Sequence, residues 1–303
     1  MVEFLQRTLD GLLDGASYAL VGLGLALTFG TLKRLNLAYG AGAMLAAYIG
    51  AWLHQRHGAP AWAVAAAMIA AATALGLYVE RLCFAGALPA RGAGPVAGGD
   101  GREVVALASS FAIWMQLEQL AVNLLPRHLN PFPSLAVQSE WSIGPVVLRP
   151  DRLALALLAV APTLALARWL RTTRGGLAWR AAADQRIAAQ LAGIPVTHVQ
   201  MLVFAAACAL SGIAAFAVLA LEGQVTPMFG MWVLVKGLVA AMLGGLSIPG
   251  VLAGGLLLGA VEAHAQALAG PLAREFVAYA LLFVVLLRPW RRFHPEASAS
   301  HAG

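Results

Sequence analysis

The sequence predicts an all-α protein, a polytopic bundle of transmembrane helices. Its 303 residues are 60% hydrophobic and only 11% charged, with a mean hydropathy of +0.77, whereas soluble domains carry about 25% charged residues. Residues 15–32, 58–79 and 187–221 contain no charged residue, and a helix needs about 20 mostly apolar residues to cross a bilayer. These runs do not alternate in polarity, as the strands of a membrane β-barrel would.

We expect about eight to nine membrane segments within a single transmembrane domain that covers residues 1–303. The expected segments are 9–30, 37–54, 60–82, 104–125, 152–170, 199–221, 230–247, 250–268 and 274–288. The second and the last are short, so one of them could be re-entrant rather than spanning.

The distribution of basic residues predicts the orientation. If every segment crosses, thirteen Lys and Arg residues lie in the connections on one side and six on the other. Basic residues are enriched in cytoplasmic connections, so the C-terminus is expected in the cytoplasm and the N-terminus outside. The sequence pI near 9.9 does not indicate a nucleic-acid partner, because the positive charges lie between apolar runs rather than on one face.

Four connections differ in composition. Residues 84–103 are rich in Gly, Ala and Pro and predict a flexible cytoplasmic loop. Residues 126–151 contain several prolines and predict an ordered external loop. Residues 175–198 are Ala-rich, helix-forming and charged, which predicts a cytoplasmic helix between two membrane segments. Residues 289–303 predict a cytoplasmic tail.

Small residues recur four positions apart inside the apolar runs, as in Gly11 and Gly15, and again within "GVLAGGLLLG" (250–259). In lipid, such spacing lets two helix backbones approach closely. We therefore expect these glycines to pack helices, and a face that moves is the alternative.

Lys236 and Glu262 are charges inside predicted segments, where each costs about 2.5 kcal/mol or more. A charge pair between neighbouring helices is the simplest interpretation. A direct substrate or proton role, or a Lys236 side chain that extends to the membrane surface, are the alternatives. Asp14 and Glu118 are expected near an interface.

Motifs for chemistry are absent from the sequence. It contains no GxxxxGK[ST] loop for nucleotide phosphates and no HExxH zinc motif. Cys83 and Cys208 stand apart without metal-ligand spacing and are expected to be packing residues. We therefore expect no enzyme activity, no metal site and no cofactor bound by this chain.

Four stretches carry a family resemblance. "DGLLDGASYALVGLGLALTFGTLKRLNLAYGAGAMLAAYIG" (10–50) and "VTPMFGMWVLVKGLVAAMLGGLSIPGVLAGGLLLGAVEAHAQAL" (225–268) resemble the N- and C-terminal signatures of the permease subunits of branched-chain amino acid ABC importers. "RAAADQRIAAQLAGIPV" (180–196) and "LLRPW" (286–290) are similar to the family's cytoplasmic loop and ending. Where the family usually has His, Gly and Glu, this sequence has Tyr39, Gly40 and Ala41, so it departs at the first and third positions. In addition, "LGGLSIPG" is one residue shorter than is common.

The resemblance implies a permease subunit in the bacterial inner membrane. Its expected partners are a homologous second permease, two ATPase subunits that carry the ATP, a periplasmic solute-binding protein and the lipid bilayer. It also implies that residues 177–194 form a helix that docks on the ATPase, ended by Gly193 as C-cap with a proline beyond, and that bulky charged residues at Ala182 and Ala188 would uncouple ATP hydrolysis from transport.

Two sets of site residues follow from the resemblance. The ATPase-coupling residues are expected to be Trp179, Arg180, Ala182, Asp184, Ala188, Leu191 and Gly193. The candidates for the solute pathway are Tyr18, Asn36, Tyr39, Gly40, Gly244 and Gly245.

Other functions remain open at this point. Importers of urea or short amides share these signatures, so the solute is not fixed. An ion-coupled secondary transporter or channel would use buried charges such as Lys236 and Glu262 around broken helices. A membrane enzyme would need clustered catalytic side chains, which the sequence does not present.

Overall fold

The computed structural model describes residues 2–32, 36–84, 99–125, 130–135, 141–143 and 146–287, and a helix lies at each of the nine expected segments. The long helices are α1 Val2–Leu32, α2 Ala38–His57, α3 Ala61–Val79, α4 Gly99–Leu124, α5 Pro150–Thr172, α8 Val196–Glu222, α9 Phe229–Leu243, α10 Ile248–Ala269 and α11 Pro271–Leu287. A π-helical turn, η1 Glu80–Phe84, extends α3. Six helices, α1, α3 with η1, α4, α5, α8 and α10, are long and apolar enough to cross a membrane.

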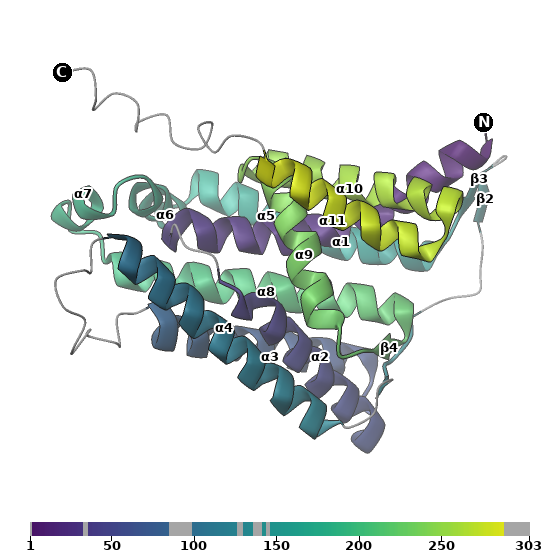
Figure 1. Cartoon of the computed structure of the whole chain (residues 1–303), viewed down its shortest axis with the longest axis horizontal. Helices are drawn as coiled ribbons and strands as arrows, with labels where there is room; N and C mark the ends of the chain where they lie inside the picture. The colour runs from purple at the N-terminus through teal and green to yellow at the C-terminus, as the bar shows by residue number, and fades with distance from the viewer. Residues whose placement is uncertain are drawn as a thin grey trace.

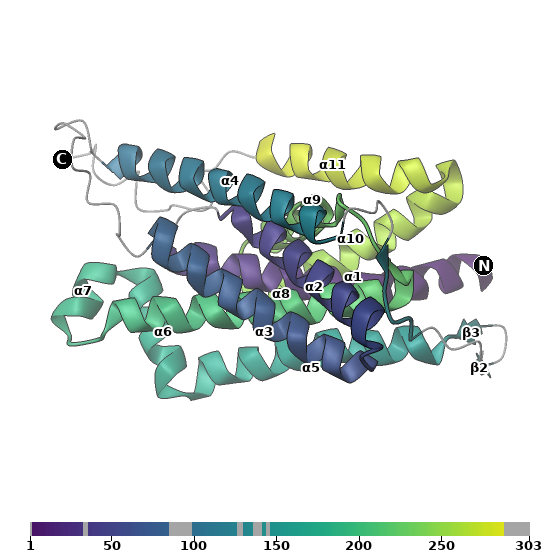
Figure 2. The ribbon, with the colours of Figure 1, turned by 90° about the horizontal axis from the view of Figure 1, so that it is seen from below.

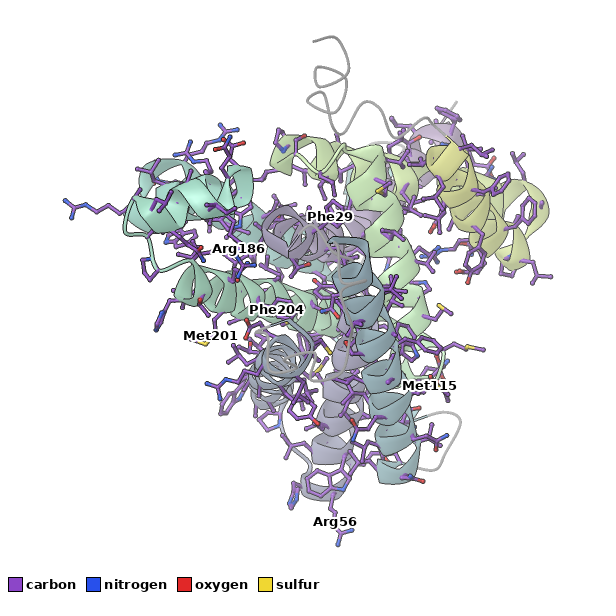
Figure 3. All side chains as sticks on the ribbon, turned by 60° about the vertical axis from the view of Figure 1, so that its left-hand side comes forward. Phe29, Arg56, Met115, Arg186, Met201 and Phe204 are labelled. Carbon is purple, nitrogen blue, oxygen red and sulfur yellow. The ribbon has the colours of Figure 1, made fainter. Side chains whose placement is uncertain are left out.

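The centre of the bundle is formed by α1 and α8. In their most apolar windows 72% and 67% of the residues are buried, compared with 28–33% in α3, α4, α5 and α10. Phe204 of α8 is buried inside the bundle, whereas Met115 of α4 lies on its outside (Figure 3). Apolar side chains that face outward are expected where the surrounding medium is lipid.

Helix α9 is steeply inclined to α1, α8 and α10 (Figure 1) and is seen nearly end-on in Figure 2. Its 15 residues extend about 22 Å, which is less than the roughly 30 Å of a bilayer core. The seventh segment is therefore short as well as the last, since α11 has 17 residues. The prediction of 230–247 as one helix is wrong at its end, because residues 244–246 form a turn.

The two ends of the bundle differ. Two short helices, α6 Arg174–Asp184 and α7 Arg186–Leu191, lie at one end, and the N-terminus lies at the other (Figures 1 and 2). We call these the α7 end and the N-terminal end.

Part of the predicted loop 84–103 is helical. Residues 85–98 and the tail 289–303 lie outside the described residues, but α4 begins at Gly99, so residues 99–103 are helical and the predicted boundary is wrong there.

At the N-terminal end, the described parts of 126–151 form short antiparallel pairs. Strand β1 Asn130–Pro131 pairs with β4 Gln224–Val225, and β2 Trp141–Ile143 pairs with β3 Val146–Leu148. The Phe132 N–H donates to the Gly223 carbonyl at 2.9 Å, and the Phe132 ring lies 5.9 Å from that of Phe216. These contacts attach the segment to the end of α8.

Glycines bring α1 and α10 into direct backbone contact. A Cβ atom built on Gly11 would lie 2.6 Å from the carbonyl oxygen of Gly259, and one built on Gly15 would lie 2.6 Å from that of Gly255. Any larger residue would hold the helices apart. The prediction that these glycines pack helices is confirmed.

Candidate functional site

Charged and polar side chains from four helices meet in one buried group, which we call the charged centre: Tyr18 of α1, Lys236 of α9, Glu262 of α10 and Arg274 of α11. Lys236 Nζ contacts Glu262 Oε1 as an ion pair. Glu262 Oε2 accepts hydrogen bonds from Tyr18 Oη at 3.0 Å and from Arg274 Nε at 3.2 Å. The Arg274 guanidinium also donates to Tyr18 Oη through Nη2, so the four side chains form one connected network.

Burial explains why these groups are paired. Lys236 and Glu262 are each only 1% exposed, and a single unpaired charge at that depth would be strongly destabilising. Lys236 also lies 5.6 Å from the ring centroid of Tyr18 and 5.9 Å from that of Trp232, within the range of cation–π attraction. Its Nζ is 3.5 Å from a carboxylate oxygen of Glu275. The structure thus places Lys236 on Glu262, as the pair interpretation expects, and not at the membrane surface.

A cavity of about 420 Å³ lies beside the charged centre, towards the N-terminal end. Its charged walls are Arg7, Asp10, Asp14, Arg152, Glu262 and Arg274, and Tyr18 also faces it. Two of the ion pairs there are loose: Arg152 lies 3.5 Å from Asp10, and Arg274 lies 3.9 Å from Asp14. Basic and acidic groups therefore alternate around a space large enough for a small molecule.

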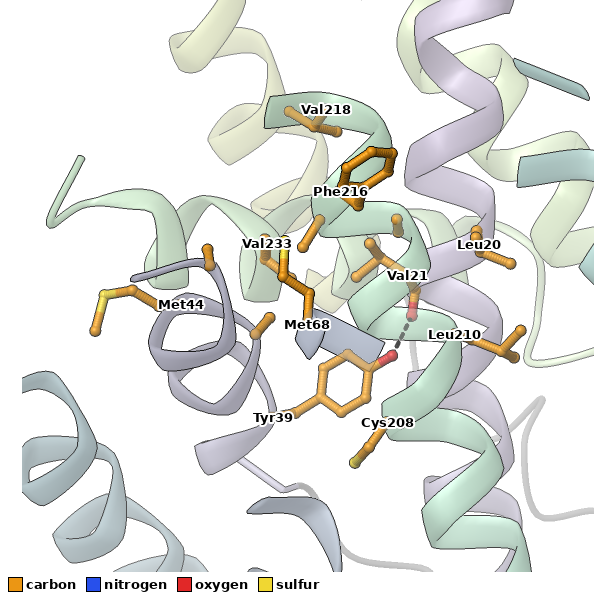
Figure 4. Close-up of a cluster of buried hydrophobic side chains, with 14 of the residues drawn as sticks. Leu20, Val21, Tyr39, Met44, Met68, Cys208, Leu210, Phe216, Val218 and Val233 are labelled. Atoms are coloured by element: carbon orange, nitrogen blue, oxygen red, sulfur yellow. Dashed lines mark hydrogen bonds between the residues drawn. The ribbon is translucent and has the colours of Figure 1, made fainter. Parts of the chain in front are cut away.

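The other pathway candidates are not assembled around this cavity. Asn36 and Tyr39 are buried and line a much smaller void of about 10 Å³. Tyr39 Oη donates to the carbonyl oxygens of Val21 at 3.3 Å and Ala207 at 3.2 Å (Figure 4). Tyr39 thus joins α2 to α1 and α8.

Three candidate glycines serve packing or a turn. Gly40 faces the backbone of Gly230 in α9 so closely that a side chain would meet it. Gly244 and Gly245 lie in the turn between α9 and α10, where Gly245 has φ +61°, a left-handed conformation that glycine adopts at little cost. Among the six pathway candidates, Tyr18 alone lines the 420 Å³ cavity.

The segment 174–191 folds as two helices, α6 and α7, so the prediction of one helix over 177–194 is wrong. The Thr173 side chain caps the start of α6, where its Oγ1 accepts a hydrogen bond from Gly176 N at 3.1 Å. Gln185 then adopts an extended conformation (φ −134°, ψ 96°) that separates α6 from α7.

Helix α7 ends as predicted. Gly193 has φ +80°, and the N–H groups of Gly193 and Ile194 donate to the carbonyls of Gln190 at 3.0 Å and Ala189 at 3.0 Å. These two hydrogen bonds form the Schellman motif of a helix C-terminus. The prediction that Gly193 caps the helix, with a proline two residues beyond it, is confirmed.

The expected coupling residues face different ways. Ala182 is 4% exposed and packs in a small cluster with Ala189 and Val196, so its prediction as a docking residue is wrong: it holds α6 and α7 against α8. Trp179 is half-buried, and its ring lies 3.3 Å from the position of a Cβ atom on Gly30. The exposed members are Arg180, Asp184, Ala188, Leu191 and Gly193.

Arg274 of the charged centre and Arg152 at the cavity wall are not among the site residues expected from the sequence. Each is the first residue of an expected segment, 274–288 and 152–170, where a basic residue is typical of an interface. The signal that points to Arg274 is its neighbour: "ARE" (273–275) places opposite charges side by side early in an otherwise apolar helix.

The comparisons with known proteins agree with this architecture. Residues 7–286 match the family described as "Branched-chain amino acid transport system / permease component". The chain is 28% identical to the high-affinity branched-chain amino acid transport system permease protein BraD of Pseudomonas aeruginosa, over 94% of each chain. It is also 28% identical to the permease protein LivH of Escherichia coli K12, over 94% of this chain and 93% of that one.

A solved structure shares the fold. A chain of a metal-chelate type ABC transporter in an inward-facing conformation superposes with a TM-score of 0.52 at 16% identity, covering 93% of this chain and 85% of that one. Because the family match extends over nearly the whole sequence, the chain belongs to the family of branched-chain amino acid transport system permease components.

Proposed function

We propose that this chain is the permease subunit of an ATP-binding cassette importer that moves branched-chain or other small neutral amino acids inward across the inner membrane. The observation that carries the proposal is the family match over residues 7–286. The charged centre supports it, because Tyr18 lies in the N-terminal signature and Lys236 and Glu262 lie in the C-terminal one.

The importer would contain a homologous second permease, two ATPase subunits that bind ATP, and an external solute-binding protein. This chain supplies part of the solute pathway, and ATP bound by the partners shifts the populations of its inward-open and outward-open states. The printed names of BraD and LivH describe permease proteins of transport systems, which supports an assembly of several chains.

In this proposal the α7 end is cytoplasmic and the N-terminal end is periplasmic, with nine membrane segments including the inclined α9. Basic residues support the orientation: Arg168, Arg171, Arg174, Arg180 and Arg186 all belong to the α7 end. Helix α11 runs from the N-terminal end in the direction of the α7 end (Figure 1), as a cytoplasmic C-terminus requires.

The proposed contact with the ATPase is the exposed surface of α7. Ile187 is 74% exposed and Leu191 is 85% exposed, and Ala188 lies exposed between them. Exposed apolar side chains in a segment that faces water indicate a contact surface for a partner protein. The exposed Arg180 and Asp184 of α6 flank it and would fix its register.

Replacing Ala188 or Leu191 by glutamate is expected to uncouple the importer: uptake falls at least tenfold, while the permease still folds, because both side chains are exposed. Uptake of labelled leucine and ATP hydrolysis by the reconstituted importer measure this. His198→Glu, an exposed position early in α8, is the matched control and should retain uptake. Full coupling in both α7 variants would contradict the assignment of α7.

Co-expression tests the function itself. The chain is expected to co-purify with a nucleotide-binding subunit, and vesicles that contain the complex and a solute-binding protein should import leucine only with ATP. Import by the purified chain alone, driven by an ion gradient, would overturn the proposal in favour of a secondary transporter.

A further inference from the structure

The groups around the 420 Å³ cavity differ in how fully their hydrogen bonds are used. Glu262 is saturated, because Lys236, Tyr18 and Arg274 all contact its carboxylate. Among the described residues, the Asp14 carboxylate makes one ion pair, at 3.9 Å with Arg274, much longer than the roughly 2.7–2.9 Å of a charge-assisted hydrogen bond. The Glu262 carboxylate therefore has its hydrogen bonds filled by neighbouring side chains, whereas Asp14 and part of the Arg274 guanidinium are available to a ligand.

The second loose pair has the same character. Arg152 Nη1 lies 3.5 Å from Asp10, and Asp10 receives one further bond, from Gln6 Nε2 at 3.2 Å. The side chains of Asp10, Asp14, Arg152 and Arg274 are between 27% and 33% exposed. Each loose pair thus presents a carboxylate and a guanidinium side by side at the wall of the cavity.

We propose that this cavity binds the amino acid itself, as a zwitterion, with its ammonium group on Asp14 and its carboxylate on Arg274 or Arg152. An α-amino acid carries both charges on one carbon, which matches a carboxylate and a guanidinium about 4 Å apart. The inference rests on the proposed function, because it names the place in the permease where the transported solute binds.

The remaining walls are formed by small residues and one amide. Between the charges the cavity is lined by Gly11, Gly259, Ala263, Ala267 and Gln266. The glycines and alanines leave space for a ligand side chain, and the Gln266 amide is the one uncharged polar group among these five. The cavity volume is within the roughly 300–1,000 Å³ range of small-molecule sites.

Loose pairs also suit a transport step. When a ligand binds, its two charges replace the weak contact between Asp14 and Arg274. The net gain in binding free energy is therefore small. A solute that must leave again has to be held by such a modest balance. The ligand does not replace the ion pair between Lys236 and Glu262.

The test measures binding to the full-length chain in lipid nanodiscs, with tritiated L-leucine as the probe. L-leucinamide, which lacks the carboxylate, and 4-methylpentanoate, which lacks the ammonium, are the competitors, and each is expected to compete at least tenfold more weakly than unlabelled leucine. Equal competition by all three would overturn the zwitterion site.

Variants locate the site. Asp14→Asn should weaken leucine binding at least tenfold, because it removes the charge-assisted contact with the ammonium group, and Ala267→Phe should weaken it by filling the space. Arg56→Gln is the matched control: Arg56 is exposed at the end of α2 and points away from the bundle (Figure 3), so binding should not change. Unchanged binding in Asp14→Asn and Ala267→Phe would overturn the proposal.

The assembled importer separates the two proposals. If it imports leucine while the chain alone shows no binding, and Asp14→Asn leaves import intact, the zwitterion site is wrong and the importer function stands. If the chain binds leucine through Asp14 but no nucleotide-binding subunit associates with it, the site stands and the importer function is wrong.

Discussion

Replacing Glu262 by glutamine is expected to destabilise the folded chain by about 3–5 kcal/mol, the cost of leaving a buried charge without its partner. Lys236 is 1% exposed and, of its two ion pairs, would keep only the one at 3.5 Å with Glu275. Arg274 would lose the acceptor of its Nε–H. The unfolding midpoint in detergent and the yield of monodisperse protein measure the effect.

The partner substitution is expected to be milder. Lys236→Met leaves Glu262 bonded to Tyr18 and Arg274, so one cation still compensates the buried carboxylate. In the double variant Lys236→Met, Glu262→Gln both buried charges of the pair are gone, and stability should return towards that of Lys236→Met. A double-mutant cycle reports this coupling. Strictly additive losses would contradict the direct pair.

The second large effect is expected at the seam between α1 and α10. Gly15→Leu should abolish accumulation of folded protein, and Gly15→Ala should already cost about 2 kcal/mol through overpacking. A Cβ atom there would lie 2.6 Å from the carbonyl oxygen of Gly255 and 2.9 Å from the Cα of Leu256. Both are backbone atoms, which cannot swing aside as a side chain would.

A matched control is available in α2. A Cβ atom on Gly42 would meet only Leu75 Cβ, at the ordinary contact distance of 4.0 Å. Gly42→Ala should therefore be neutral or stabilising by up to about 1 kcal/mol, since alanine favours a helix more than glycine does. Equal thermal shifts for Gly15→Ala and Gly42→Ala would show that close backbone packing is not what Gly15 provides.

The helices were predictable because long apolar runs are unambiguous. Each of the nine expected segments contains a helix, and the glycine spacing at Gly11 and Gly15 announced a close helix contact. The spacing did not identify α10 as the partner, because sequence spacing describes one face and not the helix opposite it. The inclination of α9 is likewise decided by packing against its neighbours.

The site was predictable only where a charge stood alone in apolar sequence. Lys236 and Glu262 have no charged neighbour in the chain, so an ion pair between them was the simplest interpretation. Arg274, Asp10 and Arg152 lie near segment ends, where charges are common, and their convergence required the arrangement of α1, α5 and α11. The break at Gln185 was missed because it is neither glycine nor proline, and the wrong docking role of Ala182 followed from assuming one continuous helix.

One helix connects the cavity with α6, which flanks the proposed ATPase contact. At its α7 end, α1 carries Gly30 against the Trp179 ring of α6, and towards its other end it carries Asp14 and Tyr18 at the cavity. Its 31 residues make a rod of about 47 Å, which packs on α10 at Gly11 and Gly15 and is hydrogen-bonded to it through Tyr18. A displacement of α6 would therefore reach the cavity as an axial slide or rotation of α1, without any signal having to pass from one side chain to the next through the core.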